Sequence, residues 1–125
     1  MMKEFDTALV FLCSGTMKSG DKKLSYRIAK QLQDRGVADI GNLEMLSIQH
    51  LIPAGLRKKM IFINDCRSAC VKVLMHGFEA DQYLFFDVSG LNEATFNMVQ
   101  FIAEEILPKM SQKWNYVLSA ANHSA

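Results

Sequence analysis

Three short apolar runs, residues 8–13, 59–64 and 83–88, constrain the fold of this chain most. None of them shows the alternation of apolar and polar residues that marks a strand with one face in water. A continuous apolar run of this length is typical of a strand that is buried on both faces, as in a parallel sheet. We therefore expect an α/β fold.

Helical spacing follows the first two of these runs. After the first run, Leu24, Ile28 and Leu32 recur on one face, with Asp21 as the expected N-cap and Gly36 as the stop. After the second run, a helix is expected from Ser68 to about residue 76, closed by Gly77. Strands that alternate with helices in this way indicate right-handed βαβ units.

A third helix is expected to begin near Asn92. Its apolar stripe is predicted to consist of Phe96, Val99, Ala103, Ile106 and Met110. Pro108 should kink or end this helix, because a proline cannot donate a hydrogen bond to the carbonyl of Glu104.

The remaining segments decide the order of the strands. Residues 40–46 are weakly patterned and are interpreted as a short strand, and residues 47–57 as a loop with a short helical turn. The simplest order places strand 8–13 beside strand 59–64, with strands 40–46 and 83–88 on the two outer edges. We expect one three-layer domain over residues 1–125, with a small, mainly parallel, doubly wound (Rossmann-like) sheet.

Charge and hydropathy limit the partners. Fourteen basic and thirteen acidic residues leave a net charge of +1, which gives no electrostatic reason to expect nucleic acid or a membrane surface. No apolar run approaches the ~20 residues that cross a bilayer, and none fits a signal peptide. A soluble, cytoplasmic protein is therefore expected, whose partner is a metal ion or a small molecule.

The three cysteines are the main functional signal. Cys13 ends the first strand and Cys66 follows the strand beside it, so both should lie at the switch point where α/β sheets bind ligands. Cys70 lies four residues beyond Cys66, at the expected start of a helix. Thiolates suit Zn²⁺, and a fourth ligand could be Asp65, a histidine such as His50, a water or a substrate atom.

These residues resemble a family of small proteins named for an Asp-Gly-Cys (DGC) motif, for which zinc binding is proposed. The resemblance runs from about Leu9 to Gly90 and rests on residues 13–15, 64–66, 69–72, 76–78 and the strand that contains Asp87. It implies that Cys13, Cys66 and Cys70 are zinc ligands. Two departures stand out: Asn64-Asp65 replaces Asp-Gly, and the family's fourth cysteine would fall near Asn42.

Other interpretations of the cysteines remain open. Cys66 could form a disulfide with Cys70 or Cys13, which would indicate thiol-based redox chemistry or sulfur transfer. The loop after Cys13 resembles that of low-molecular-weight tyrosine phosphatases, but Ser19 stands where their arginine is expected. Alternatively, the cysteines are inert apolar filler in an interaction domain.

The terminal helix raises the question of a homodimer. Phe96, Phe101, Trp114 and Tyr116 are gathered near this helix. Core packing is the preferred explanation for these aromatic side chains. Any of them that face solvent would mark a dimer surface.

Overall fold

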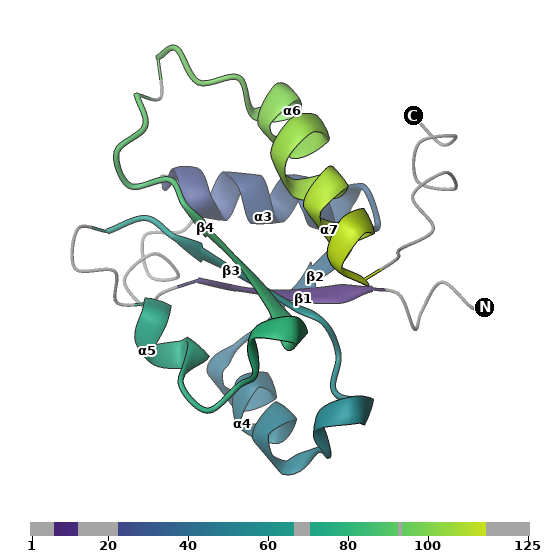
Figure 1. Cartoon of the computed structure of the whole chain (residues 1–125). Coiled ribbons are helices and arrows are strands. Elements are labelled where there is room, and N and C mark those ends of the chain that lie inside the picture. The colour runs from purple at the N-terminus through teal and green to yellow at the C-terminus, as the bar shows by residue number, and fades with distance from the viewer. Residues whose placement is uncertain (1–6, 13–22, 67–70, 93, 115–125) are drawn as a thin grey trace.

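The computed structural model of this chain describes residues 7–12, 23–66, 71–92 and 94–114. These residues form one sheet of four parallel strands in the order β2-β1-β3-β4 (Figure 1). The strands are β1 (Ala8–Leu12), β2 (Ala38–Ile40), β3 (Met60–Asn64) and β4 (Tyr83–Asp87). The expected α/β class, the parallel sheet and the strand order are confirmed.

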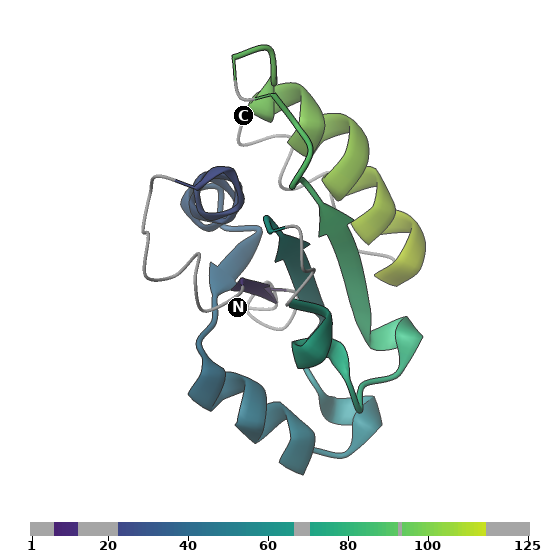
Figure 2. The same ribbon diagram turned by 90° about the vertical axis from the view of Figure 1, so that its left-hand side faces the viewer.

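Helices cover both faces of the sheet and make three layers (Figures 1 and 2). One face carries α3 (Leu24–Asp34) and a terminal helix made of α6 (Met98–Phe101), the π-helical segment η4 (Ile102–Ile106) and α7 (Leu107–Trp114). The other face carries α4 (Leu43–Leu51) and α5 (Val71–Met75). The short turns η2 (Ala54–Leu56) and η3 (Ala80–Gln82) precede β3 and β4.

Alternate side chains of the central strands supply the two cores. Val10 and Ile63 belong to the cluster under α3 and the terminal helix, whereas Phe11 and Phe62 belong to the cluster under α4 and α5. Because every residue of β1 and β3 is buried, both strands read as continuous apolar runs in the sequence.

The end of α3 follows the expected glycine stop. Gly36 has a φ of 74°, a left-handed conformation that glycine adopts at low cost. The N–H of Val37 donates to the carbonyl of Leu32, and that of Gly36 to Gln33, which satisfies two carbonyls of the last turn. At the other end, the helix begins at Leu24 with Lys23 as the N-cap residue. The expected N-cap, Asp21, lies outside the described residues.

The terminal helix differs from expectation in three ways. It begins at Met98, with Asn97 as its N-cap, and not near Asn92. It continues through Pro108 to Trp114 instead of ending there, because η4 widens the turn directly before the proline. Val99 and Ala103, expected in the core, are exposed, and the buried positions are Ile102, Ile106, Leu107 and Met110. With Met98 half-buried, the inward residues recur every four positions, as a wider turn requires.

The segment between β2 and β3 also differs from expectation. The strand covers Ala38–Ile40 and ends where the expected strand 40–46 begins. Helix α4 occupies residues 43–46, expected as strand, and residues 47–51, expected as loop with a short helical turn. Asn42 begins this helix, since its side chain accepts the N–H of Met45 at 2.8 Å. Gly41 permits the close approach of the Phe11 ring, because a Cβ there would lie 2.5 Å from Cε1 of Phe11.

The described residues contain no helix with the length and hydropathy that crossing a membrane requires.

Candidate functional site at the carboxyl edge of the sheet

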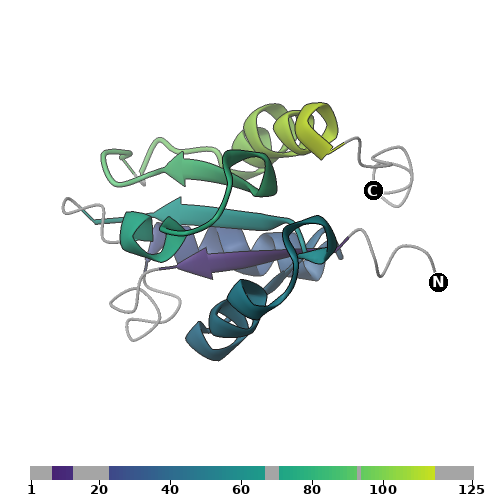
Figure 3. The same cartoon turned by 60° about the horizontal axis from the view of Figure 1, so that its bottom comes forward.

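The carboxyl ends of the strands point to one edge of the sheet (Figure 3), and Cys66 lies at this edge. It follows β3 by two residues, is half-buried, and packs against the core under α4 and α5. Cys13 and Cys70 lie outside the described residues. Leu12, which directly precedes Cys13, pairs in register with Ile63 of β3. Of the three expected metal ligands, the structure therefore places Cys66.

Asn64, the last residue of β3, organises this edge. Its side chain is buried, with a residue exposure of 1%, and its Nδ2 donates to the carbonyl of Cys66 at 2.8 Å. The same nitrogen donates to Oδ1 of Asp87 at 3.0 Å, and Asp87 lies opposite Asn64 in register at the end of β4. The amide thus ties the two strand ends and the start of the following loop together.

The orientation of the Asn64 side-chain amide determines which of its atoms contacts Sγ of Cys66. Because Nδ2 donates to two oxygens, Oδ1 is the atom that faces Cys66, with Sγ at 3.5 Å. An amide oxygen only accepts hydrogen bonds, so the sulfur is the donor in this contact.

Asp87 adds a negative charge next to this amide. The backbone N–H of Ser89 donates to Oδ1 at 3.0 Å and, together with the Ser89 and Asn64 side chains, lowers the pKa of the carboxyl below its ordinary value. Burial opposes this shift only weakly, because Asp87 is exposed. The carboxylate is therefore charged at neutral pH, as its role as acceptor requires.

Asp65, which was considered as a metal ligand, has a different contact. Its Oδ2 accepts the backbone N–H of Ser25 in the first turn of α3, at 2.9 Å. A carboxylate is favourable there, because the N-terminus of a helix carries a partial positive charge and unpaired N–H groups. Asp65 therefore caps a helix that lies forty residues earlier in the chain. Within the described residues, the hydroxyl of Ser25 is buried without a hydrogen-bond partner.

The histidines do not approach this edge in the described part of the chain. His50 lies in the last turn of α4 and stacks on Phe78, with ring centroids 4.0 Å apart. Because α4 runs back from the end of β2 toward the start of β3, this contact lies at the amino end of the sheet. His50 is therefore not a fourth ligand. His76 directly follows α5, and His123 lies outside the described residues.

Among the residues that the structure describes, no three histidine, cysteine, aspartate or glutamate side chains come together as a metal site. The phosphate-loop alternative, which concerns residues 13–20, falls entirely outside the described ranges.

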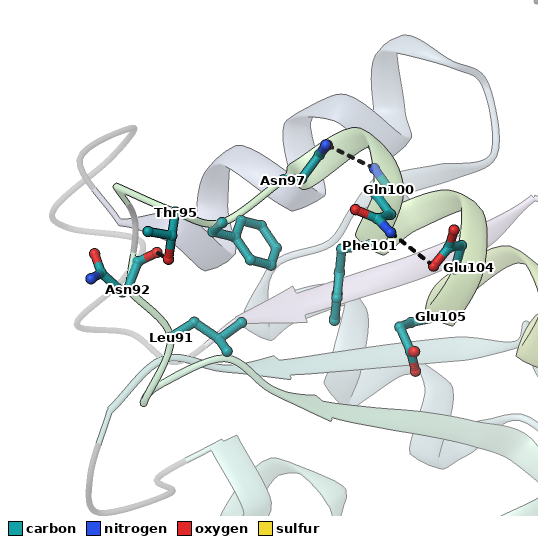
Figure 4. A pocket seen from close by; sticks show the side chains of 9 residues that line it. Leu91, Asn92, Thr95, Asn97, Gln100, Phe101, Glu104 and Glu105 are labelled. Atoms are coloured by element: carbon teal, nitrogen blue, oxygen red, sulfur yellow. Dashed lines mark hydrogen bonds between the residues drawn. The ribbon is translucent and has the colours of Figure 1, made fainter.

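A separate hollow of about 340 Å³ lies between the loop after β4 and the terminal helix (Figure 4). Its polar side chains are paired with one another or with neighbours: Gln100 donates to Glu104 at 3.2 Å, and Lys109 donates to Glu105 at 3.3 Å. Apolar side chains, among them Leu91 and Phe101, also line it. Because none of the described residues that line this hollow is a cysteine or a histidine, it does not compete with the carboxyl edge for the chemistry that the sequence suggests.

In comparisons with known proteins, no family model, curated protein or solved structure matches this chain. The resemblance to the DGC proteins stays a prediction.

Two residues of this edge were missed as participants in the site. Asn64 and Asp87 both stand at the end of an otherwise apolar run, and this was the available signal. A polar side chain that ends a doubly buried strand needs a partner, and in a parallel sheet the neighbouring strand end supplies it. The sequence placed the two strands side by side, but it did not show that these residues share one register.

Proposed function

We propose that this protein binds a metal ion, zinc first, through cysteines at the carboxyl edge of its sheet. The single observation that carries the proposal is the pairing of β1 with β3. Leu12 is in register with Ile63, so the chain leaves two neighbouring strands at the same edge, immediately before Cys13 and shortly before Cys66. Cys70 follows four residues later. Zinc bound there would hold these segments together through thiolate bonds.

The described donor set fits such an ion in part. Cys66 is half-buried and lies next to the amide of Asn64, where a ligand sulfur would keep a fixed position. To become a ligand, its sulfur must lose the proton that it now donates to Oδ1 of Asn64. Asp65 is engaged as a helix cap through Oδ2, so we do not assign it to the ligand set.

A second candidate function is thiol–disulfide exchange, which the partial exposure of Cys66 allows. In this alternative, Cys66 and a second cysteine reduce a small disulfide: the two protein thiols lose two electrons and two protons, and the substrate is released as two thiols. The attacking species in such an exchange is the thiolate, so Cys66 must first lose the proton that it donates to Oδ1 of Asn64. Its sulfur is half-buried, which leaves it open to a small disulfide.

Metal analysis of the untagged full-length chain, purified without oxygen, separates the two candidates. Near-stoichiometric zinc that disappears in Cys66→Ser supports the proposal. The matched control is Ser89→Ala, which alters the same edge but leaves every sulfur in place. Metal-free protein in which Cys66 and one other cysteine become a disulfide on treatment with oxidised glutathione supports the alternative. Metal-free protein whose three cysteines all stay thiols under that treatment contradicts both.

A further inference from the structure

The helix α4 leaves an apolar face without cover in the described structure. Leu43, Ile48 and Leu51 are exposed by 54%, 49% and 84%, and we call this set the α4 face. Met45, which is 40% exposed, lies on another side of the helix. Only Leu46 and Gln49 of this helix are buried. A soluble chain rarely leaves adjacent large apolar side chains in water, and such patches mark interaction surfaces.

The α4 face has a symmetric row at its centre. Leu43, Ser47 and Leu51 are four residues apart, so they lie one above the other along the helix. The row has leucine, serine, leucine in either direction. The hydroxyl of Ser47 donates to the carbonyl of Leu43 at 3.2 Å, so it already has a partner and can be covered at little cost.

This symmetry suits a two-fold axis. In a two-fold dimer, the same patch of both copies forms the interface, so the patch must be complementary to itself. With the axis at Ser47 and the helices antiparallel, Leu43 of one copy meets Leu51 of the second copy. The small serines face each other at the axis, which lets the two helices approach closely.

Charge selects the antiparallel arrangement. Glu44 lies exposed in the first turn of α4. At the other end, Arg57 donates through Nε to the carbonyl of Ile52 at 2.8 Å and through Nη2 to that of His50 at 3.4 Å. An antiparallel pair brings Glu44 toward the Arg57 end of the second copy, whereas a parallel pair would place the two Glu44 side chains together.

We propose that a second copy of this chain covers the α4 face, through antiparallel pairing of α4 about Ser47. Leu56, 76% exposed and just beyond the helix, extends the apolar surface. A nine-residue helix is about 13 Å long and supplies less than the ~800 Å² per partner of a standard interface. The dimer therefore belongs to the small, reversible class, and its population depends on concentration. This proposal does not depend on metal binding.

Sedimentation equilibrium of the full chain tests the proposal, at concentrations up to about 500 µM in reducing buffer so that disulfides do not contribute. We expect a monomer–dimer equilibrium that Leu51→Glu weakens at least about tenfold. The matched control is Val99→Glu, which places the same charge at a position that is 56% exposed on the opposite face of the sheet. It should leave the equilibrium unchanged. A chain that stays monomeric throughout, or a Leu51→Glu variant that dimerises as tightly as the wild type, overturns the proposal.

A cross-link locates the axis. In Ser47→Cys, oxidation should join two copies through residue 47, which peptide mapping identifies, because the two sulfurs would lie close together on the axis. Val99→Cys should give no such peptide. Dimers that form in solution but yield no 47–47 link would place the interface elsewhere and overturn the proposed pairing.

Discussion

The two faces of the sheet carry hydrophobic cores of different size. We call the face under α3 and the terminal helix the deeper face, and the face under α4 and α5 the shallower face. Among the described residues, seventeen buried side chains form the core under α3 and the terminal helix, and seven form the core under α4 and α5. The central strands feed both faces alternately, so the difference comes from the helices. α3 buries Leu24, Ile28 and Leu32, whereas α4 buries Leu46 and Gln49. The deeper face buries more apolar side chains, and the shallower face leaves the α4 face exposed.

A matched pair of leucines tests this difference most strongly. Leu32→Ala in α3 should lower the free energy of unfolding by about 4 kcal/mol, because Leu32 is fully buried in a dense core that cannot collapse around the cavity. Leu46→Ala in α4 should cost about 2 kcal/mol, since fewer neighbours surround that side chain. Urea titrations followed by circular dichroism measure both values. Equal losses would contradict the contrast between the two faces.

The shallower face nevertheless contains a tightly packed point at Gly41. We expect Gly41→Ala to destabilise the protein by about 2 kcal/mol, because the added methyl would lie 2.5 Å from the ring of Phe11. Gly55→Ala is the control, since its Cβ would meet nothing within 4 Å and its φ is not positive. Thermal unfolding of both variants checks this. A neutral Gly41→Ala would mean that the face can relax at this point as well.

The helix caps give a smaller effect that should be the same on the two faces. Asn42 caps α4 and Asn97 caps α6, each accepting a backbone N–H from three residues ahead. Replacing either by alanine should cost about 1 kcal/mol, because a cap acts locally. Hydrogen exchange of Met45 and Gln100 amides would report the fraying. A much larger loss for Asn42→Ala would show that α4 depends on its cap more than on its packing.

The smallest expected effect is on the pH dependence of the free energy of unfolding. The pKa of Asp87 is lower in the folded chain than in the unfolded one, so its contribution to stability is present above the unfolded value and is lost as the pH falls through the folded value. The contribution should be under about 1 kcal/mol, because the carboxylate is exposed. The wild type should therefore lose more stability than Asp87→Asn as the pH falls below about 4. Parallel losses in the two chains would show that the hydrogen bonds to Asp87 contribute nothing.

The sheet could be predicted from the sequence because doubly buried strands have a plain signature. Helix α4 could not be, since its apolar residues lie on both its buried and exposed sides and so show no helical periodicity. The stripe of the terminal helix was placed on Val99 and Ala103 because ordinary helical spacing was assumed, and η4 has a wider turn.

Of the candidate site, too, one part could be predicted from the sequence and another could not. That Cys13 and Cys66 follow neighbouring strands was predictable from the order of the strands, and the pairing of β1 with β3 confirms that order. The role of Asp65 as a cap for α3 was not, because it joins residues forty positions apart and leaves no local pattern.

This link between Asp65 and Ser25 gives the protein an internal spectroscopic probe. Asp65, which lies next to Cys66 in the loop after β3, accepts a hydrogen bond from the first turn of α3, and the proton of this bond belongs to the amide of Ser25. A displacement of that loop, whether through metal loading, oxidation or alkylation of the neighbouring sulfur, would lengthen or break this bond. The chemical shift of the Ser25 amide in a nuclear magnetic resonance spectrum would then change when the sulfur of Cys66 is modified, although the two groups are not bonded to each other.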